Sequence, residues 1–91
     1  MIPREEIDLE RAYLIEPVLS AKKVEFYYSM GKETLLENVR RARKNPICVN
    51  ICVYEGEVIP EIIDGCHRAK ALYKYGIRTI KAEIENDRRG L

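Results

Sequence analysis

The sequence has no tryptophan, one histidine and one phenylalanine among its 91 residues, and it has no excess of either charge. Sixteen Lys and Arg residues nearly balance fifteen Asp and Glu residues, so the chain lacks the strong positive charge typical of nucleic-acid-binding domains. No apolar run approaches the roughly 20 residues that a membrane helix needs, and the N-terminus has no signal-peptide pattern. These absences predict a cytoplasmic protein without a membrane partner.

The three cysteines are too few and too poorly spaced to predict a disulfide framework or a zinc site. Their number is odd, and no Cys-x-x-Cys pair occurs. Cys48 and Cys52 lie four residues apart in an apolar stretch, so in a strand they would share a face. They are predicted to be buried thiols that act as small hydrophobic side chains.

Composition and length predict one globular domain over residues 1–91, because 46% of the residues are hydrophobic and 34% are charged. The core is expected between about residues 7 and 84, and residues 85–91 are expected to form a charged tail. Residues 7–9 and 12–15 each suit a short strand, and Ser20 suits a helix N-cap. Apolar spacings of three and four predict a long helix over 22–44, which Gly31 could instead divide into two.

The second half of the chain predicts a hairpin, a helix and a final strand. Segments 47–53 and 58–63 are apolar and flank a Glu55-Gly56 turn, while Pro60 indicates an edge or a bulge. A helix follows Gly65 and is expected to end at Gly76 in a left-handed conformation. Residues 80–84 alternate as in a half-buried strand. The fold class is therefore α/β (α+β), a compact domain with a small mixed sheet flanked by helices.

The turn Asp64-Gly65-Cys66-His67-Arg68 is the candidate binding site, because it joins an apolar strand to a helix. The glycine permits a tight turn, and the first N–H groups of the helix favour an anion, above all phosphate. Gly65, Cys66, His67 and Arg68 are the predicted phosphate-binding residues, with Arg68 able to bind in a bidentate manner. Alternatively, Asp64 only caps the helix and Arg68 only pairs with a surface carboxylate.

Two residues of this turn indicate different chemistries. A thiol in the first turn of a helix beside basic residues has a lowered pKa, so Cys66 is a candidate nucleophile. Asp64 would repel a phosphate unless it holds Mg²⁺ or accepts a proton from the acceptor substrate. Cys66, Asp64 and His67 are accordingly the candidate catalytic residues, and Asp64 is the candidate metal ligand.

The segment 62–71 resembles the nucleotide-binding motif of the ParB/sulfiredoxin superfamily, which includes ParB-like nuclease domains. Gly65-x-x-Arg68-x-x-Ala71 resembles the ParB box, and Gly65-Cys66-His67-Arg68 resembles the sulfiredoxin active-site motif. Asp64-Gly65 before the His-Arg pair resembles the small-molecule kinases of the same fold. The resemblance implies that ATP, or another nucleotide such as CTP, binds with Mg²⁺, and that Lys23 is a further phosphate ligand.

Three functions follow from these observations. The first is a nucleotide-binding domain that performs ATP-dependent phosphoryl transfer or hydrolysis. The second is a sulfiredoxin-like, ATP-dependent reductase of cysteine sulfinic acid, in which Cys66 acts on a peroxiredoxin-like protein partner. The third is a non-catalytic module that binds DNA or protein, with Arg40, Arg43 and Lys44 as nucleic-acid contacts near one helix face.

Overall fold

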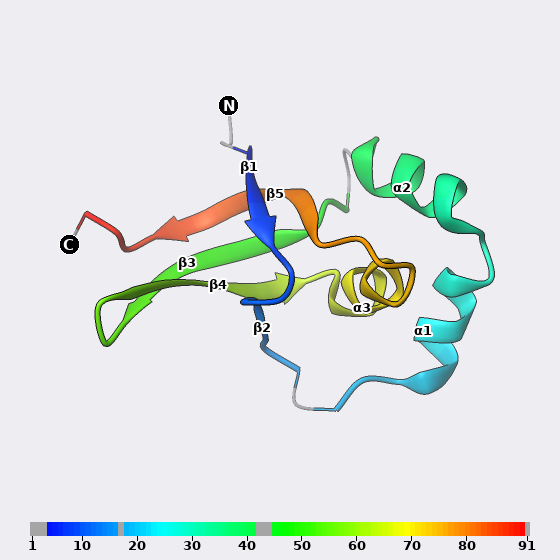
Figure 1. Ribbon diagram of the computed structural model, residues 1–91, viewed down its shortest axis with the longest axis horizontal. Coiled ribbons are helices and arrows are strands. Elements are labelled where there is room, and N and C mark those ends of the chain that lie inside the picture. The colour runs from blue at the N-terminus through cyan, green and yellow to red at the C-terminus, as the bar shows by residue number, and fades with distance from the viewer. Residues whose placement is uncertain (1–3, 17, 42–44, 91) are drawn as a thin grey trace.

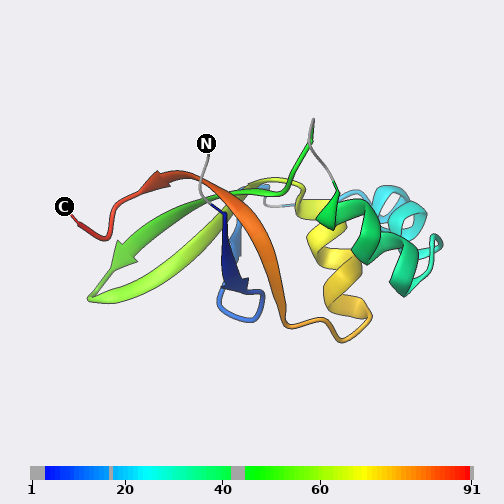
Figure 2. The ribbon, with the colours of Figure 1, turned by 90° about the horizontal axis from the view of Figure 1, so that it is seen from above.

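A computed structural model describes residues 4–16, 18–41 and 45–90 of the chain. The elements are, in order, β1 (Arg4–Asp8), β2 (Tyr13–Leu14), α1 (Ala21–Tyr28), α2 (Lys32–Arg40), β3 (Cys48–Tyr54), β4 (Glu57–Asp64), α3 (Cys66–Lys74) and β5 (Thr79–Asp87). The helices gather at one end of the sheet, and the β3–β4 hairpin projects from the other (Figures 1 and 2). No helix of the described ranges is both long and apolar enough to cross a bilayer.

The sheet is five-stranded with the order β1-β5-β3-β4-β2. Strand β3 pairs antiparallel with β4 and parallel with β5, while β1 is antiparallel to β5 and β2 is parallel to β4. The predicted small mixed sheet flanked by helices is confirmed. Both short N-terminal segments are strands, and they lie at opposite edges of the sheet.

The long helix predicted over 22–44 is wrong in the form of one continuous helix, and the division at Gly31 is confirmed. Helix α1 ends at Tyr28, and Gly31 precedes α2 with a φ of 89°, a left-handed conformation that glycine adopts without strain. Ser20 caps α1 as expected, because its hydroxyl accepts a hydrogen bond from Lys23 N–H at 3.4 Å. Arg43 and Lys44 lie outside the described residues.

The edge position that Pro60 indicates is confirmed locally, although β4 is internal by strand order. Strand β2 pairs only with Glu61 and Ile62 of β4, so no residue of β2 pairs with Pro60. The irregularity between β3 and β4 falls between Cys48 and Val49. Strand β5 runs to Asp87, so the tail predicted over 85–91 is wrong for its first three residues.

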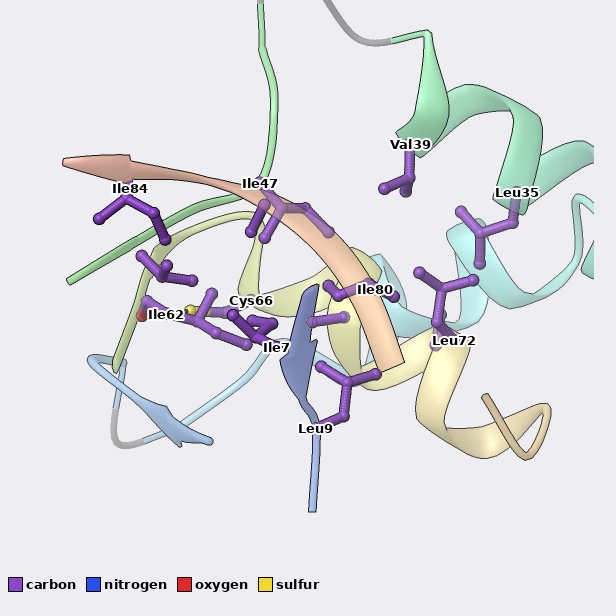
Figure 3. Close-up of a cluster of buried hydrophobic side chains, with 14 of the residues drawn as sticks. Ile7, Leu9, Leu35, Val39, Ile47, Ile62, Cys66, Leu72, Ile80 and Ile84 are labelled. Atoms are coloured by element: carbon purple, nitrogen blue, oxygen red, sulfur yellow. Dashed lines mark hydrogen bonds between the residues drawn. The ribbon is translucent and has the colours of Figure 1, made fainter. Parts of the chain in front are cut away.

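Helix α3 is the central element of the core. It buries five of its nine residues, among them Ala69, Ala71 and Leu72. Figure 3 shows Leu72 between the sheet and α2, where Leu35 and Val39 point toward it. The helix ends at Gly76, which has a φ of 87° and whose N–H donates to Tyr73 O, as the sequence predicted. Tyr73 of the same helix is partly buried.

Helix α1 is attached to α3 at both of its ends. At its start, Ser20 N–H donates to His67 Nε2 at 3.0 Å. At its end, the rings of Tyr28 and Tyr75 stack at 4.2 Å, and the Tyr75 hydroxyl donates to Tyr28 O. These contacts hold the two helices side by side along the pocket described below.

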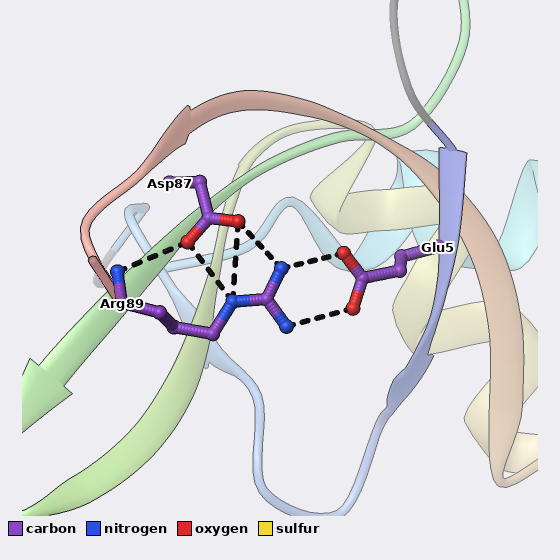
Figure 4. A network of polar contacts seen from close by, with 3 residues as sticks. All are labelled: Glu5, Asp87 and Arg89. Carbon is purple, nitrogen blue, oxygen red and sulfur yellow. Dashed lines mark hydrogen bonds and ion pairs between the residues drawn. The ribbon is translucent and has the colours of Figure 1, made fainter.

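The C-terminal residues are fastened to β1 by Arg89 (Figure 4). Its guanidinium donates to both carboxylate oxygens of Glu5 at 2.8 and 2.6 Å, and to Asp87 at 2.5 to 3.1 Å. Hydrogen bonds from Arg89 lower the pKa of Asp87 to about 2, and they also lower the pKa of Glu5. All three side chains are solvent-accessible, so the network is screened by water and salt.

We expect Asp87 to remain ionised at pH 3 and to titrate near pH 2. A lowered carboxylate pKa contributes stability above the unfolded value of 3.8, and that contribution is lost as the pH falls through about 2. Arg89→Ala should return the Asp87 pKa toward 3.8, measured by NMR of the side-chain carboxyl carbon. Arg88→Ala is the matched control and should leave it unchanged; an Asp87 pKa near 3.8 in the unmodified protein contradicts the prediction.

Candidate functional site

Gly65 forms the turn between β4 and α3 and is the N-cap of the helix, with a φ of 90°. A Cβ atom at this position would lie 2.7 Å from Ile47 Cγ1 and 3.0 Å from Arg68 Nη2. Both the left-handed backbone and the lack of space therefore require glycine. The alternative that Asp64 caps the helix is wrong, because Asp64 is the last residue of β4.

The N-terminus of α3 has no group of its own to neutralise it. Its N-cap residue has no side chain, and its first turn contains no acidic residue. The N–H groups of Cys66, His67 and Arg68 have no acceptor within the helix, because the first helical hydrogen bond runs from Ala69 N–H to Gly65 O. They are therefore free to point toward a ligand. Together with the helix dipole they favour an anion at this end.

Arg68 is the one buried charged side chain in the described part of the chain, with 4% of its surface exposed. Its Nη2 atom is buried and has no hydrogen-bond partner among the described residues. The alternative that Arg68 pairs with a surface carboxylate is therefore wrong. A buried guanidinium nitrogen without a partner is costly, so this atom is suited to bind an anionic ligand.

A pocket of about 420 Å³ opens at this helix end, between the start of α3 and one face of α1. Of the predicted phosphate-binding residues, all five line it: Lys23, Gly65, Cys66, His67 and Arg68. Further lining residues are Glu16, Lys22, Phe26, Tyr27, Asn45 and Asp64. Lys22, Lys23 and Arg68 outnumber the carboxylates of Glu16 and Asp64, so the charge of the lining favours an anion.

His67 holds the two sides of the pocket together. Its Nε2 accepts the Ser20 N–H, so a neutral ring carries its proton on Nδ1. Glu16 Oε2 lies 3.9 Å from the same Nε2, and the side chain of His67 is 12% exposed. His67 is thus a positioning residue for α1 as well as a candidate phosphate donor.

Cys66 lies in the pocket lining but does not have the properties of an activated thiol. It is 1% exposed, and its thiol donates to Ile62 O at 3.4 Å. Burial raises its pKa, an effect larger than the lowering by nearby backbone N–H groups. The lowered pKa predicted from its place at the helix start is therefore wrong, because burial against the sheet (Figure 3) opposes the helix dipole.

The carboxylates of Asp64 and Glu16 are the candidate magnesium ligands. Both are exposed at the pocket, and Asp64 directly precedes the phosphate-binding turn. Within the described ranges no cluster of three or more His, Cys, Asp or Glu residues could hold a metal. Magnesium commonly binds one or two carboxylates together with substrate phosphates, which is why these two lining residues are the candidates.

The candidate nucleic-acid contact Arg40 lies away from this pocket. It is exposed, is 4.0 Å from Glu37, and borders a different hollow between α2 and β5. Sequence reasoning missed five of the lining residues: Glu16, Lys22, Phe26, Tyr27 and Asn45. The available signal was helical spacing, because Phe26 follows Lys23 by three residues and must share its face.

No protein-family model matches this chain, and no curated protein sequence matches it. Among solved structures, it is similar to sulfiredoxin from Arabidopsis thaliana, with a TM-score of 0.55 and 22% sequence identity. The match covers 97% of this chain and 91% of that chain. At this identity the likeness shows the fold, which is the ParB/sulfiredoxin fold that the sequence motif predicted.

Gly65→Ala should destabilise the protein more than Gly76→Ala. Both glycines have a φ near 90°, where an alanine costs about 1–2 kcal/mol. Only at Gly65 does the added Cβ overlap a neighbour, and such overpacking costs about 1–3 kcal/mol more. Urea denaturation of the two variants measures the difference, and equal losses would show that the close approach to Ile47 is not a constraint.

Proposed function

Proceeding from the ParB/sulfiredoxin fold, we propose that this chain is a nucleotide-binding domain that transfers or hydrolyses a phosphoryl group of ATP or a related nucleotide. The observation that carries the proposal is the buried Nη2 of Arg68, which has no hydrogen-bond partner among the described residues, in a side chain that lines a pocket at the N-terminus of α3. A phosphate oxygen is the acceptor that best completes this arrangement, because guanidinium groups and helix N-terminal N–H groups both bind phosphates.

The phosphate chain would contact both helices that border the pocket. Arg68 and the first N–H groups of α3 bind from one side, and Lys23 of α1 supplies a second cation. Lys23 is exposed, so binding would order its side chain. Such a site promotes reaction mainly by positioning the phosphates and stabilising the charge of the transition state.

Asp64 is the residue best suited to the chemical step. In a transfer, an acceptor oxygen bonds to the terminal phosphorus, the bond to the bridging oxygen breaks, and a nucleoside diphosphate leaves. Asp64 would accept the proton of the attacking hydroxyl or water. Asp64 and Glu16 would hold Mg²⁺, which supplies charge neutralisation for the phosphates.

Arg68→Met should weaken nucleotide binding strongly without lowering the stability of the protein. Methionine keeps apolar volume but removes a buried guanidinium nitrogen that has no partner within the described ranges, a change that is commonly neutral or stabilising. Calorimetric titration with ATP and Mg²⁺ should show at least tenfold weaker binding, and thermal unfolding should show an unchanged or higher midpoint.

The matched pair for this test is Lys23→Ala and Lys32→Ala, which remove exposed lysines of α1 and α2. Lys23 lines the pocket and Lys32 does not appear among its lining residues. Lys23→Ala should weaken ATP binding several-fold, and Lys32→Ala should leave it unchanged. If Arg68→Met binds ATP as the unmodified protein does, the phosphate site is wrong.

A sulfiredoxin-like reduction is the second candidate function. Two observations favour it: the fold shared with sulfiredoxin, and the position of Cys66 in the lining of the same pocket. The raised pKa of the buried thiol opposes it, because the thiolate is the nucleophile. In this reading a peroxiredoxin-like partner would supply the sulfinic acid, and ATP would activate it.

Asp64→Asn and Cys66→Ser separate the two chemistries. Release of phosphate from ATP should fall at least tenfold in Asp64→Asn, because the proton acceptor and metal ligand is lost. Cys66→Ser should keep most of that activity. Retained activity in Asp64→Asn combined with its loss in Cys66→Ser would reverse the assignment and favour the thiol chemistry.

A further inference from the structure

The phosphate pocket has an aromatic side that phosphate binding does not use. Phe26 and Tyr27 of α1 line it together with Arg68 and Asp64. Their rings meet edge to face, with centroids 5.3 Å apart and an interplanar angle of 74°. Phe26 is the single phenylalanine of the chain, and 64% of its surface is exposed, so burial in the core does not explain it.

The lining changes in character along α1. Ser20, at the start of the helix, is hydrogen-bonded to His67 at the phosphate end. Lys23 follows three residues later and Phe26 three residues after that, so both lie near one face of the helix. At a rise of 1.5 Å per residue, Phe26 lies about 9 Å along the axis from Ser20. A nucleotide has the same order of chemistry, from anionic phosphates through a sugar to a flat aromatic base.

The size of the pocket agrees with a ligand larger than phosphate. Its volume of about 420 Å³ falls in the range of roughly 300–1,000 Å³ that is typical of small-molecule sites. A phosphate held by Arg68 and the start of α3 would occupy only one end. The remaining space lies beside an exposed aromatic ring, and every nucleobase can stack on such a ring.

We infer that the ring of Phe26 stacks on the base of the bound nucleotide, and that this contact distinguishes a nucleotide from an inorganic phosphate or a phosphorylated side chain. The inference rests on the proposed phosphate site. Among the described lining residues of this part of α1, the groups able to hydrogen-bond a base edge are Lys22 and the Tyr27 hydroxyl. Stacking accepts every nucleobase, so the preference between bases should be modest. Purines should bind better than pyrimidines, because preferences of this kind follow stacking strength.

The test compares ATP with inorganic tripolyphosphate as calorimetric probes of the full chain. Phe26→Ala should weaken ATP binding by about fivefold or more and leave tripolyphosphate binding unchanged, since stacking on an aromatic side chain has effects of this size. Tyr54→Ala is the matched control, because Tyr54 is 65% exposed and lies in β3, outside the pocket. It should change neither affinity.

A second measurement reports the contact directly. The chain has no tryptophan, so Phe26→Trp introduces a unique fluorophore at the proposed stacking position. Its emission should be quenched by ATP, GTP, CTP and UTP, and tripolyphosphate should leave it unchanged. The affinity of Phe26→Trp for ATP should equal or exceed that of the unmodified protein.

The outcomes separate this inference from the function on which it rests. If tripolyphosphate binds and Phe26→Ala weakens neither probe, the base contact is wrong and the phosphate site stands. If the unmodified protein binds neither probe, both are wrong. A preference above a hundredfold for one base would also overturn recognition by stacking, because it requires specific hydrogen bonds.

Discussion

The close approach of Gly65 to Ile47, with the guanidinium of Arg68 beside it, is the contact on which the rest of the site depends. It lets α3 begin directly against β3, so the helix N-terminus lies at the sheet and its N–H groups face the pocket. It also leaves Arg68 buried with one guanidinium nitrogen that no residue in the described part of the chain pairs with. An unsatisfied buried group of this kind costs about 1–3 kcal/mol or more. In return, the guanidinium of Arg68 is already desolvated before a ligand binds, and this strengthens its interaction with an anion.

The second constraint is the attachment of α1 to α3. Neither helix forms the pocket alone: α3 contributes the turn with Arg68, and α1 contributes Lys23 and Phe26. The hydrogen bond from Ser20 to His67 joins them at one end, and the Tyr28–Tyr75 stack joins them at the other. Because His67 contacts α1 through Nε2, the residue that looks catalytic in the sequence also maintains the geometry of the site.

Features that depend on neighbours in the sequence were predictable. The hairpin, the final strand, the left-handed Gly76 and the glycine turn before α3 all rest on local conformational preferences, above all those of glycine and of alternating apolar residues. The properties of Cys66 were not predictable in this way. Its place at a helix start indicates a lowered pKa, but its burial against the sheet raises the pKa, and burial is a consequence of long-range packing.

The sequence by itself determined which residues form the turn between β4 and α3 and which fold they imply, because a glycine between an apolar strand and an amphipathic helix has few conformational alternatives. Tertiary structure alone decided that Asp64 does not cap α3, that Arg68 is buried rather than paired at the surface, and that Phe26 lies in the same pocket. The physical reason is that solvent exposure and the second wall of a pocket are set by packing between segments distant in the chain. Sequence periodicity shows which residues share one face of a helix, but it does not show which other segment packs against that face.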